Sequence, residues 1–93
     1  MEREGQSKLV VREGPSPGEE YSLDQAATLI GRAPSNDLVV NFPSVSSSHA
    51  KITSEGQNYF LEDLGSSNGT FVNGERITGR HLLSSGDEIG LGK

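Results

Sequence analysis

The feature that most constrains this chain is a series of short apolar segments separated by turn residues at intervals of about 8–12 residues. No segment repeats its apolar residues with the 3.6-residue period of a helix. Short strands at this spacing are typical of an all-β sandwich or barrel. We therefore predict strands at Lys8–Arg12, Glu19–Leu23, Ala27–Arg32, Leu38–Val40, His49–Thr53, Tyr59–Leu64, Thr70–Val72, Arg76–Ile77, Arg80–Leu83 and Glu88–Leu91.

The length of 93 residues fits a single domain with a modest core. Residues 1–7 are polar, and we expect them to form a flexible N-terminal tail, with residues 8–93 forming the domain. Hydrophobic residues make up only 31% of the chain, so each apolar position must be well placed for the chain to fold alone. The Asn73-Gly74 pair is the strongest hairpin signal.

Charge and composition exclude several classes of function. The net charge of −5 disfavours a general nucleic-acid binder, although a single phosphate needs only a few local donors. The chain has no cysteine, so it can form neither a disulfide nor a thiolate metal site, and we expect neither a metal nor a cofactor. It also lacks an apolar run long enough to span a membrane and an N-terminal signal core, and we expect a cytoplasmic protein that does not bind membranes.

Short polar side chains gather in two predicted loops, Ser44–His49 and Gly65–Thr70, and Gly31-Arg32 ends a predicted strand nearby in sequence. Hydroxyls, amides and a guanidinium are the donors that an oxyanion requires. Ser and Asn also favour turns because they hydrogen-bond to their own backbone, so composition alone leaves a purely structural interpretation open.

The order of the motifs distinguishes these interpretations. Gly31-Arg32, Ser46-x-x-His49, Asn68-Gly69-Thr70, Asn73-Gly74 and Gly86-Asp87 follow one another with strand patterns between them. From about residue 8 to residue 92, this arrangement resembles the forkhead-associated (FHA) domain. The resemblance implies a sandwich of two twisted antiparallel sheets, with loops at one end that bind a phosphothreonine-containing peptide of a partner protein in extended form.

The resemblance also assigns roles to individual residues. Arg32 matches the arginine that pairs with the phosphate, and Ser46 matches the serine that bonds a phosphate oxygen. Ser67 matches a position that helps to bind the phosphate and to hold the threonine methyl. Asn68 matches the asparagine that fixes the peptide main chain, and His49 matches a histidine that braces the loops from inside.

The remaining candidate residues support the site or depart from the family pattern. Gly31, Gly69 and Thr70 match positions that support the loops. Ser47 stands where the family often has Arg or Lys, and its hydroxyl can bond the ligand but adds no positive charge. We therefore include Ser47 in the predicted phosphopeptide site and expect one of two consequences: either binding is weaker than usual for the family, or Ser47 bonds the peptide backbone instead.

The end of the chain is a second departure from the family pattern. FHA domains usually carry one more strand after the segment at Gly86–Ile89, and we expect this chain to lack it. An unpaired sheet edge would follow, filled by the N-terminus of the chain, by a second copy through self-association, or by nothing.

Two other functions compete with phosphothreonine binding. The same fold could bind an unmodified partner or pair with itself. A hydrolase would need Ser46 or Ser48, His49 and Asp63 in a catalytic triad, but the chain has no G-x-S-x-G motif and its serines are too close to His49 in sequence for such chemistry. We therefore expect the domain not to be an enzyme.

Overall fold

The structure, a computed structural model, describes residues 8–10 and 17–92. These residues form strands and no helix. The predicted tail, residues 1–7, and part of the first predicted hairpin lie outside the described residues. The strands are β1 (Lys8–Val10), β2 (Glu20–Ser22), β3 (Ala27–Gly31), β4 (Leu38–Val39), β5 (Ala50–Glu55), β6 (Asn58–Asp63), β7 (Thr70–Val72), β8 (Glu75–Arg76), β9 (Arg80–Leu82) and β10 (Ile89–Leu91).

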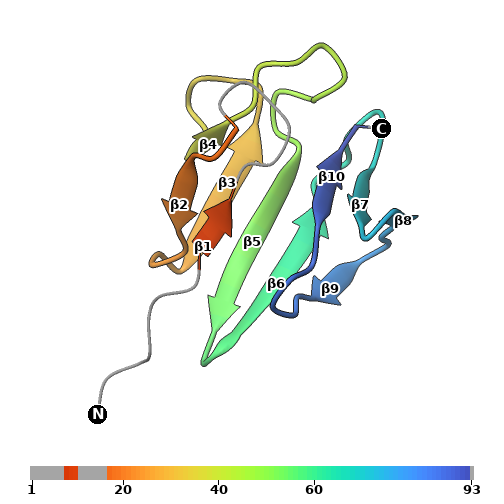
Figure 1. Cartoon of the computed structure of the whole chain (residues 1–93). Coiled ribbons are helices and arrows are strands. Elements are labelled where there is room, and N and C mark those ends of the chain that lie inside the picture. Colours follow the sequence, from red (N-terminus) through yellow and green to blue (C-terminus); the bar gives the residue numbers. More distant parts are fainter. Residues whose placement is uncertain (1–7, 11–16, 93) are drawn as a thin grey trace.

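The strands form two layers, as the sequence predicted (Figure 1). One layer is a five-stranded sheet in the order β4-β3-β5-β6-β9. The other layer contains the β1–β2 hairpin and a three-stranded sheet in the order β10-β7-β8. Neighbouring strands are antiparallel except β3 and β4, which pair in parallel with Ile30 opposite Leu38. The fold is therefore an all-β sandwich.

Alternating side chains from both layers fill the core between the sheets. In β5, for example, Ala50 and Ile52 are buried, whereas Lys51 between them is only half-buried. Ile52 lies opposite Leu61 of β6 in the ladder, so the inward-facing residues of adjacent strands form continuous rows. The buried cluster consists of Leu23, Ile30, Leu38, Ala50, Ile52, Leu61, Val72 and Ile77.

The last described strand lies at the edge of its sheet. β10 pairs with β7 through Ile89–Val72, Gly90–Phe71 and Leu91–Thr70. Within the described residues no strand follows β10, and the β1–β2 hairpin forms a sheet of its own. β10 is therefore an edge strand among the described residues.

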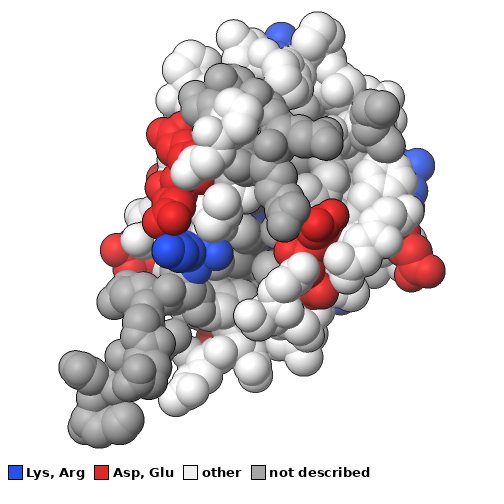
Figure 2. Space-filling view, viewed as in Figure 1, with Lys and Arg blue, Asp and Glu red and all other residues white. Residues whose placement is uncertain are grey.

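Charged residues are dispersed over the face of the molecule shown in Figure 2. Lys and Arg atoms form small, separated groups there, with Asp and Glu atoms between them. Among the described residues, surface ion pairs join Lys8 to Glu20, Lys51 to Glu62 and Arg80 to Glu55. Within the described ranges, no helix could cross a membrane.

Candidate functional site

Three loops meet at one end of the sandwich, the upper end in Figure 1. The β3–β4 loop comprises residues 32–37, the β4–β5 loop residues 40–49 and the β6–β7 loop residues 64–69. The fold thus brings together residues that are distant in sequence. The predicted phosphopeptide-binding residues all lie in these loops: Arg32, Ser46, Ser47, Ser67 and Asn68.

Ser46 is the point at which the three loops are joined. Its carbonyl accepts a hydrogen bond from the N–H of Arg32 at 2.9 Å. Its hydroxyl oxygen accepts a hydrogen bond from the N–H of Ser67 at 3.1 Å. Because the hydroxyl oxygen acts as an acceptor toward the β6–β7 loop, its own hydrogen remains for donation to a ligand.

Arg32 is exposed, yet its side chain is held in place. The Nε group donates to the carbonyl of Val45 at 2.8 Å, and Val45 itself is only 2% exposed. This bond orients the guanidinium, whose two terminal NH2 groups bond no described residue. Two parallel N–H donors match the spacing of two phosphate oxygens, so the group is suited to bidentate binding of an anion.

His49 lies at the centre of the loop cluster and is fully buried, with 0% of its surface exposed. Its Nδ1 accepts a hydrogen bond from the N–H of Ser46 at 3.0 Å, so the ring hydrogen is on Nε2. Nε2 then donates to the carbonyl of Gly69 at 2.8 Å. The ring therefore links the β4–β5 loop to the β6–β7 loop from inside, and neither nitrogen faces solvent.

The β6–β7 loop is anchored by Asp63 at the end of β6. One carboxylate oxygen accepts hydrogen bonds from the N–H groups of Gly65 and Ser66, and the other accepts from the hydroxyls of Ser66 and Thr70. The hydroxyl oxygen of Ser66 in turn accepts from the N–H of Gly69 at 2.9 Å. These bonds set the path of the loop that presents Ser67.

Two opposing effects act on the pKa of Asp63. Partial burial has the largest single influence and raises this pKa. The hydroxyls of Ser66 and Thr70, together with the backbone N–H groups of Ser66 and Gly65, stabilise the charged form and lower it. The net result is a pKa below the ordinary value of 3.8, so the loop is tied to an ionised carboxylate at neutral pH.

Asn68 and Ser67 are exposed at the tip of the β6–β7 loop. The side-chain Nδ2 of Asn68 donates to the carbonyl of Ser44 at 3.0 Å and so connects this loop to the β4–β5 loop. Its side-chain oxygen and its second N–H remain available to an extended peptide backbone, which offers one donor and one acceptor per residue.

Ser47 is also exposed, but its backbone is fixed. Its carbonyl accepts hydrogen bonds from the N–H of Ala33 at 3.2 Å and from Nδ2 of Asn36 at 2.7 Å. A Cβ atom at Gly31 would lie 2.2 Å from this carbonyl oxygen, well inside van der Waals contact. Gly31 is therefore required for the close approach of the β3 end to the β4–β5 loop.

The two other predicted supporting residues are Gly69, at the end of the β6–β7 loop, and Thr70, the first residue of β7. Gly69 has a positive φ of 94°, and the Arg76 side chain occupies the space where a Cβ would project. Thr70 is 0% exposed and its hydroxyl donates to Asp63 at 2.7 Å. Any pocket for a threonine methyl must therefore be lined by other atoms of the loops, such as those of Ser67.

Sequence reasoning missed three residues that shape this site. No role was predicted for Asn36 or for Ser66, which lies in the predicted loop Gly65–Thr70, and Asp63 was considered only as a member of a hypothetical triad. A signal for Asp63 was present, because an Asp followed by Gly and Ser at two and three residues is typical of a side chain that caps its own turn.

The structure does not assemble the triad considered for a hydrolase. Asp63 bonds the hydroxyls of Ser66 and Thr70 rather than His49. Both ring nitrogens of His49 bond backbone groups, so neither is placed to activate a serine hydroxyl.

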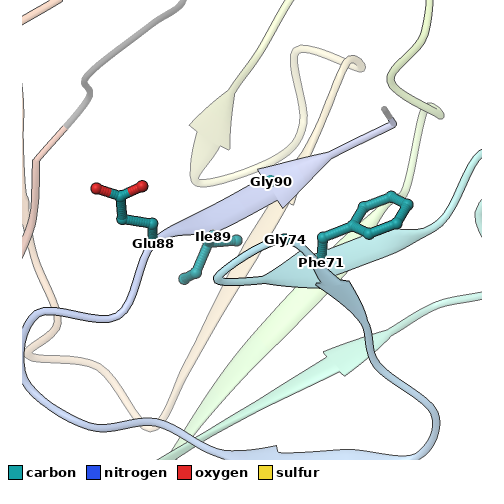
Figure 3. A pocket seen from close by; sticks show the side chains of 5 residues that line it. All are labelled: Phe71, Gly74, Glu88, Ile89 and Gly90. Atoms are coloured by element: carbon teal, nitrogen blue, oxygen red, sulfur yellow. The ribbon is translucent and has the colours of Figure 1, made fainter.

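Other parts of the described surface offer little alternative chemistry. A shallow hollow is lined by Phe71, Gly74, Glu88, Ile89 and Gly90, none of which is a candidate site residue (Figure 3). Among the residues that the structure describes, no group of His, Asp and Glu could hold a metal ion. The loop cluster is therefore the strongest candidate for a binding site.

Together, the sandwich and its loops define a binding module of all-β architecture. The model of the FHA domain family matches residues 28–92, and the chain belongs to this family. The chain is 43% identical over 90 residues to the oxoglutarate dehydrogenase inhibitor of Corynebacterium jeikeium, covering 97% of this chain and 62% of that protein. It is 40% identical to the glycogen accumulation regulator GarA of Mycolicibacterium smegmatis, covering 96% of this chain and 56% of that protein. The chain thus spans about three fifths of the length of these curated relatives.

Solved structures show the same fold. Mycobacterium tuberculosis EmbR in complex with a low-affinity phosphopeptide is 46% identical with a TM-score of 0.77, and the match covers 80% of this chain and 20% of that one. The FhaA FHA domain complexed with the intracellular domain of Rv3910 is 36% identical with a TM-score of 0.76, and the match covers 81% of each chain. FHA domains related to this one therefore form complexes with phosphopeptides and with protein domains.

Proposed function

We propose that this domain binds a phosphothreonine-containing segment of a partner protein through the three loops at one end of the sandwich. The observation that carries the proposal is the arrangement around Ser46. Its hydroxyl has a hydrogen to donate, and the neighbouring Arg32 presents two NH2 groups that bond none of the described residues. This donor set is suited to a phosphate, which brings a charge of about −1.5 to −2 and three acceptor oxygens.

The remaining exposed residues supply the contacts that a peptide needs beyond its phosphate. Asn68 has an unused acceptor and an unused donor for the peptide main chain, and the hydroxyls of Ser47 and Ser67 are exposed beside it. Charge-assisted hydrogen bonds contribute about 1.5–3 kcal/mol each, against an association cost of several kcal/mol. Micromolar affinity is the expected result.

A calorimetric titration with a degenerate phosphothreonine peptide library tests the proposal. We expect the wild-type domain to bind, and we expect dephosphorylation of the library to abolish binding. Arg32→Ala removes two charge-assisted hydrogen bonds and should weaken binding by about a hundredfold or more. Arg80→Ala is a matched control, because Arg80 is an exposed arginine paired with Glu55 on β5, away from the loops.

Two outcomes would oppose the proposal. A folded wild-type domain that binds no phosphopeptide would favour a phosphate-independent interaction domain. Equal loss of affinity in Arg32→Ala and Arg80→Ala would show that only the overall charge matters.

The same titration can compare phosphothreonine with phosphoserine in one peptide sequence. If loop atoms near Ser67 hold the threonine methyl, a phosphoserine peptide, which lacks this methyl, should bind with a free energy less favourable by about 1–3 kcal/mol. Equal affinities would show that the site reads the phosphate and the main chain alone.

The relatives point to a class of partner. Because one relative is named as an inhibitor of oxoglutarate dehydrogenase, the oxoglutarate dehydrogenase complex is the first partner to test. We expect the protein that contains this domain to regulate such an enzyme by binding to it. Dose-dependent inhibition of the purified complex would support this, and unchanged activity at saturating concentrations of the protein would exclude this partner.

A further inference from the structure

The carbonyl groups of three successive residues in the β4–β5 loop point toward the β3–β4 loop. The Val45 carbonyl accepts from the Arg32 side chain, and the Ser46 carbonyl accepts from the Arg32 N–H. The Ser47 carbonyl accepts from the N–H of Ala33 and from the Asn36 side chain. The first two of these bonds involve the predicted phosphate-binding arginine itself, and the bonds to Ser47 lie directly beside them.

Two of these donors are side chains, those of Arg32 and Asn36, and Asn36 makes no direct ligand contact in the proposed function. Its Nδ2 donates to the Ala33 carbonyl at 2.9 Å and to the Ser47 carbonyl at 2.7 Å. Both neighbours are carbonyl oxygens, so the atom between them must be the amide nitrogen, which has two hydrogens to donate. One side chain therefore satisfies an acceptor in each loop at the same time.

The packing around this contact leaves little freedom. The side chain of Asn36 is half-buried, and its Nδ2 lies 2.8 Å from the position of a Cβ at Gly31. The backbone bond from Ala33 to Ser47, at 3.2 Å, is the longest of the backbone bonds that join the two loops. The Asn36 side chain thus adds a second and shorter hydrogen bond, at 2.7 Å, to the attachment at Ser47.

We propose that Asn36 is a positioning residue of the phosphate site, which fixes the Ser46–Ser47 segment relative to Arg32. The inference rests on the proposed function, because it concerns the same site. A peptide bond is planar, so the bond from Asn36 to the Ser47 carbonyl fixes the peptide plane after Ser47, and the bond from Arg32 to the Ser46 carbonyl fixes the plane before it. The Ser46–Ser47 segment is then held on both sides of Ser47. The guanidinium and the hydroxyl then approach one phosphate without a further ordering cost.

A graded series of substitutions tests this role. Asn36→Ala leaves both carbonyls without the side-chain donor, and we expect the affinity for a phosphothreonine peptide to fall about tenfold, the equivalent of about one ordinary hydrogen bond. Asn36→Ser retains one hydrogen that can reach one carbonyl at a time, and its affinity should lie between those of Asn36→Ala and the wild type. Asn58→Ala is the matched control, because Asn58 is exposed at the opposite end of the five-stranded sheet.

A second measurement separates positioning from general stability. Hydrogen exchange of the backbone amide of Ala33 should accelerate in the Asn36 variants of the free domain, whereas amides in β5 and β6 should keep their protection. The affinities are compared at temperatures where each variant is fully folded by circular dichroism. A purely structural role would lower the protection of all these amides together and leave the affinity of the folded fraction unchanged.

The outcomes distinguish this inference from the proposed function. Wild-type binding with equal affinity in Asn36→Ala and Asn36→Ser would overturn the positioning role and leave the proposed function intact. The absence of phosphopeptide binding by the folded wild-type domain would overturn both. Tenfold weaker binding in Asn36→Ala, partial recovery in Asn36→Ser and faster exchange at Ala33 would establish the positioning role.

Discussion

The two ends of the sandwich are held together in different ways. At the loop end, side chains of one loop bond the backbone of another, as Arg32, His49 and Asn68 each do. At the opposite end, the β5–β6 hairpin closes locally through a turn at Gly56, whose φ is +63°. The loop end is thus fixed by contacts between distant residues, and the hairpin end by local backbone geometry.

This difference indicates where function and stability are coupled. A residue at the loop end acts on two loops at once, so its loss should change both the free energy of unfolding and the affinity for a ligand. A residue at the hairpin end should change stability alone. Substitutions at the two ends therefore test the comparison directly.

The largest expected effect is that of His49→Ala. The substitution removes a fully buried ring and leaves the N–H of Ser46 without its acceptor, while the Gly69 carbonyl keeps only the bond from Gly92. We expect the free energy of unfolding to fall by about 3 kcal/mol, from one unsatisfied buried group and a cavity. Urea denaturation measures the loss. A change below about 1 kcal/mol would show that the loops reorganise without the ring.

Gly31→Ala should have the next largest effect. Gly31 has no positive φ, so the cost arises from crowding, because the new Cβ would lie 2.2 Å from the Ser47 carbonyl oxygen. We expect a loss of about 2–3 kcal/mol in the free energy of unfolding as the β4–β5 loop is displaced. The affinity for the phosphopeptide should fall in the same variant. Unchanged affinity would mean that the position of Ser47 is irrelevant to the site.

Asp63→Asn should have a smaller effect that depends on pH. The carboxylate accepts four hydrogen bonds, and its loss should lower the free energy of unfolding at pH 7 by about 1–2 kcal/mol. Because the pKa of Asp63 is lowered in the folded state, its contribution is present above the ordinary value of 3.8 and is lost as the pH falls through the lowered pKa. The two proteins should therefore differ less at pH 3 than at pH 7.

Unfolding curves of the two proteins between pH 7 and pH 3 check this prediction. Asp24→Asn is the control, because Asp24 is exposed and makes no side-chain hydrogen bond within the described residues. A difference between Asp63→Asn and the wild type that stays constant over this range would contradict the link between the carboxylate and stability.

The sequence predicted the strands well because their signals are local. Turn residues and β-branched segments lie next to each other in the chain, and the strand at Tyr59–Leu64, for example, corresponds to β6. The parallel pairing of β3 with β4 was not predicted, because the direction of a strand depends on how a loop folds back. The roles of Asn36 and Asp63 were missed because an Asn or Asp in a turn looks the same whether it bonds its own turn or a second loop.

The smallest expected effect is that of Gly56→Ala at the hairpin end. Its φ of +63° is unfavourable for an L-residue, but a Cβ there would meet no atom within 4 Å. We expect the strain to lower the free energy of unfolding by about 1 kcal/mol. The affinity for the phosphopeptide should equal that of the wild type, because the side-chain bonds described for the three loops do not reach this turn. A loss of affinity comparable to that of Gly31→Ala would show that strain anywhere in the five-stranded sheet reaches the site, and the distinction between the two ends would then fail.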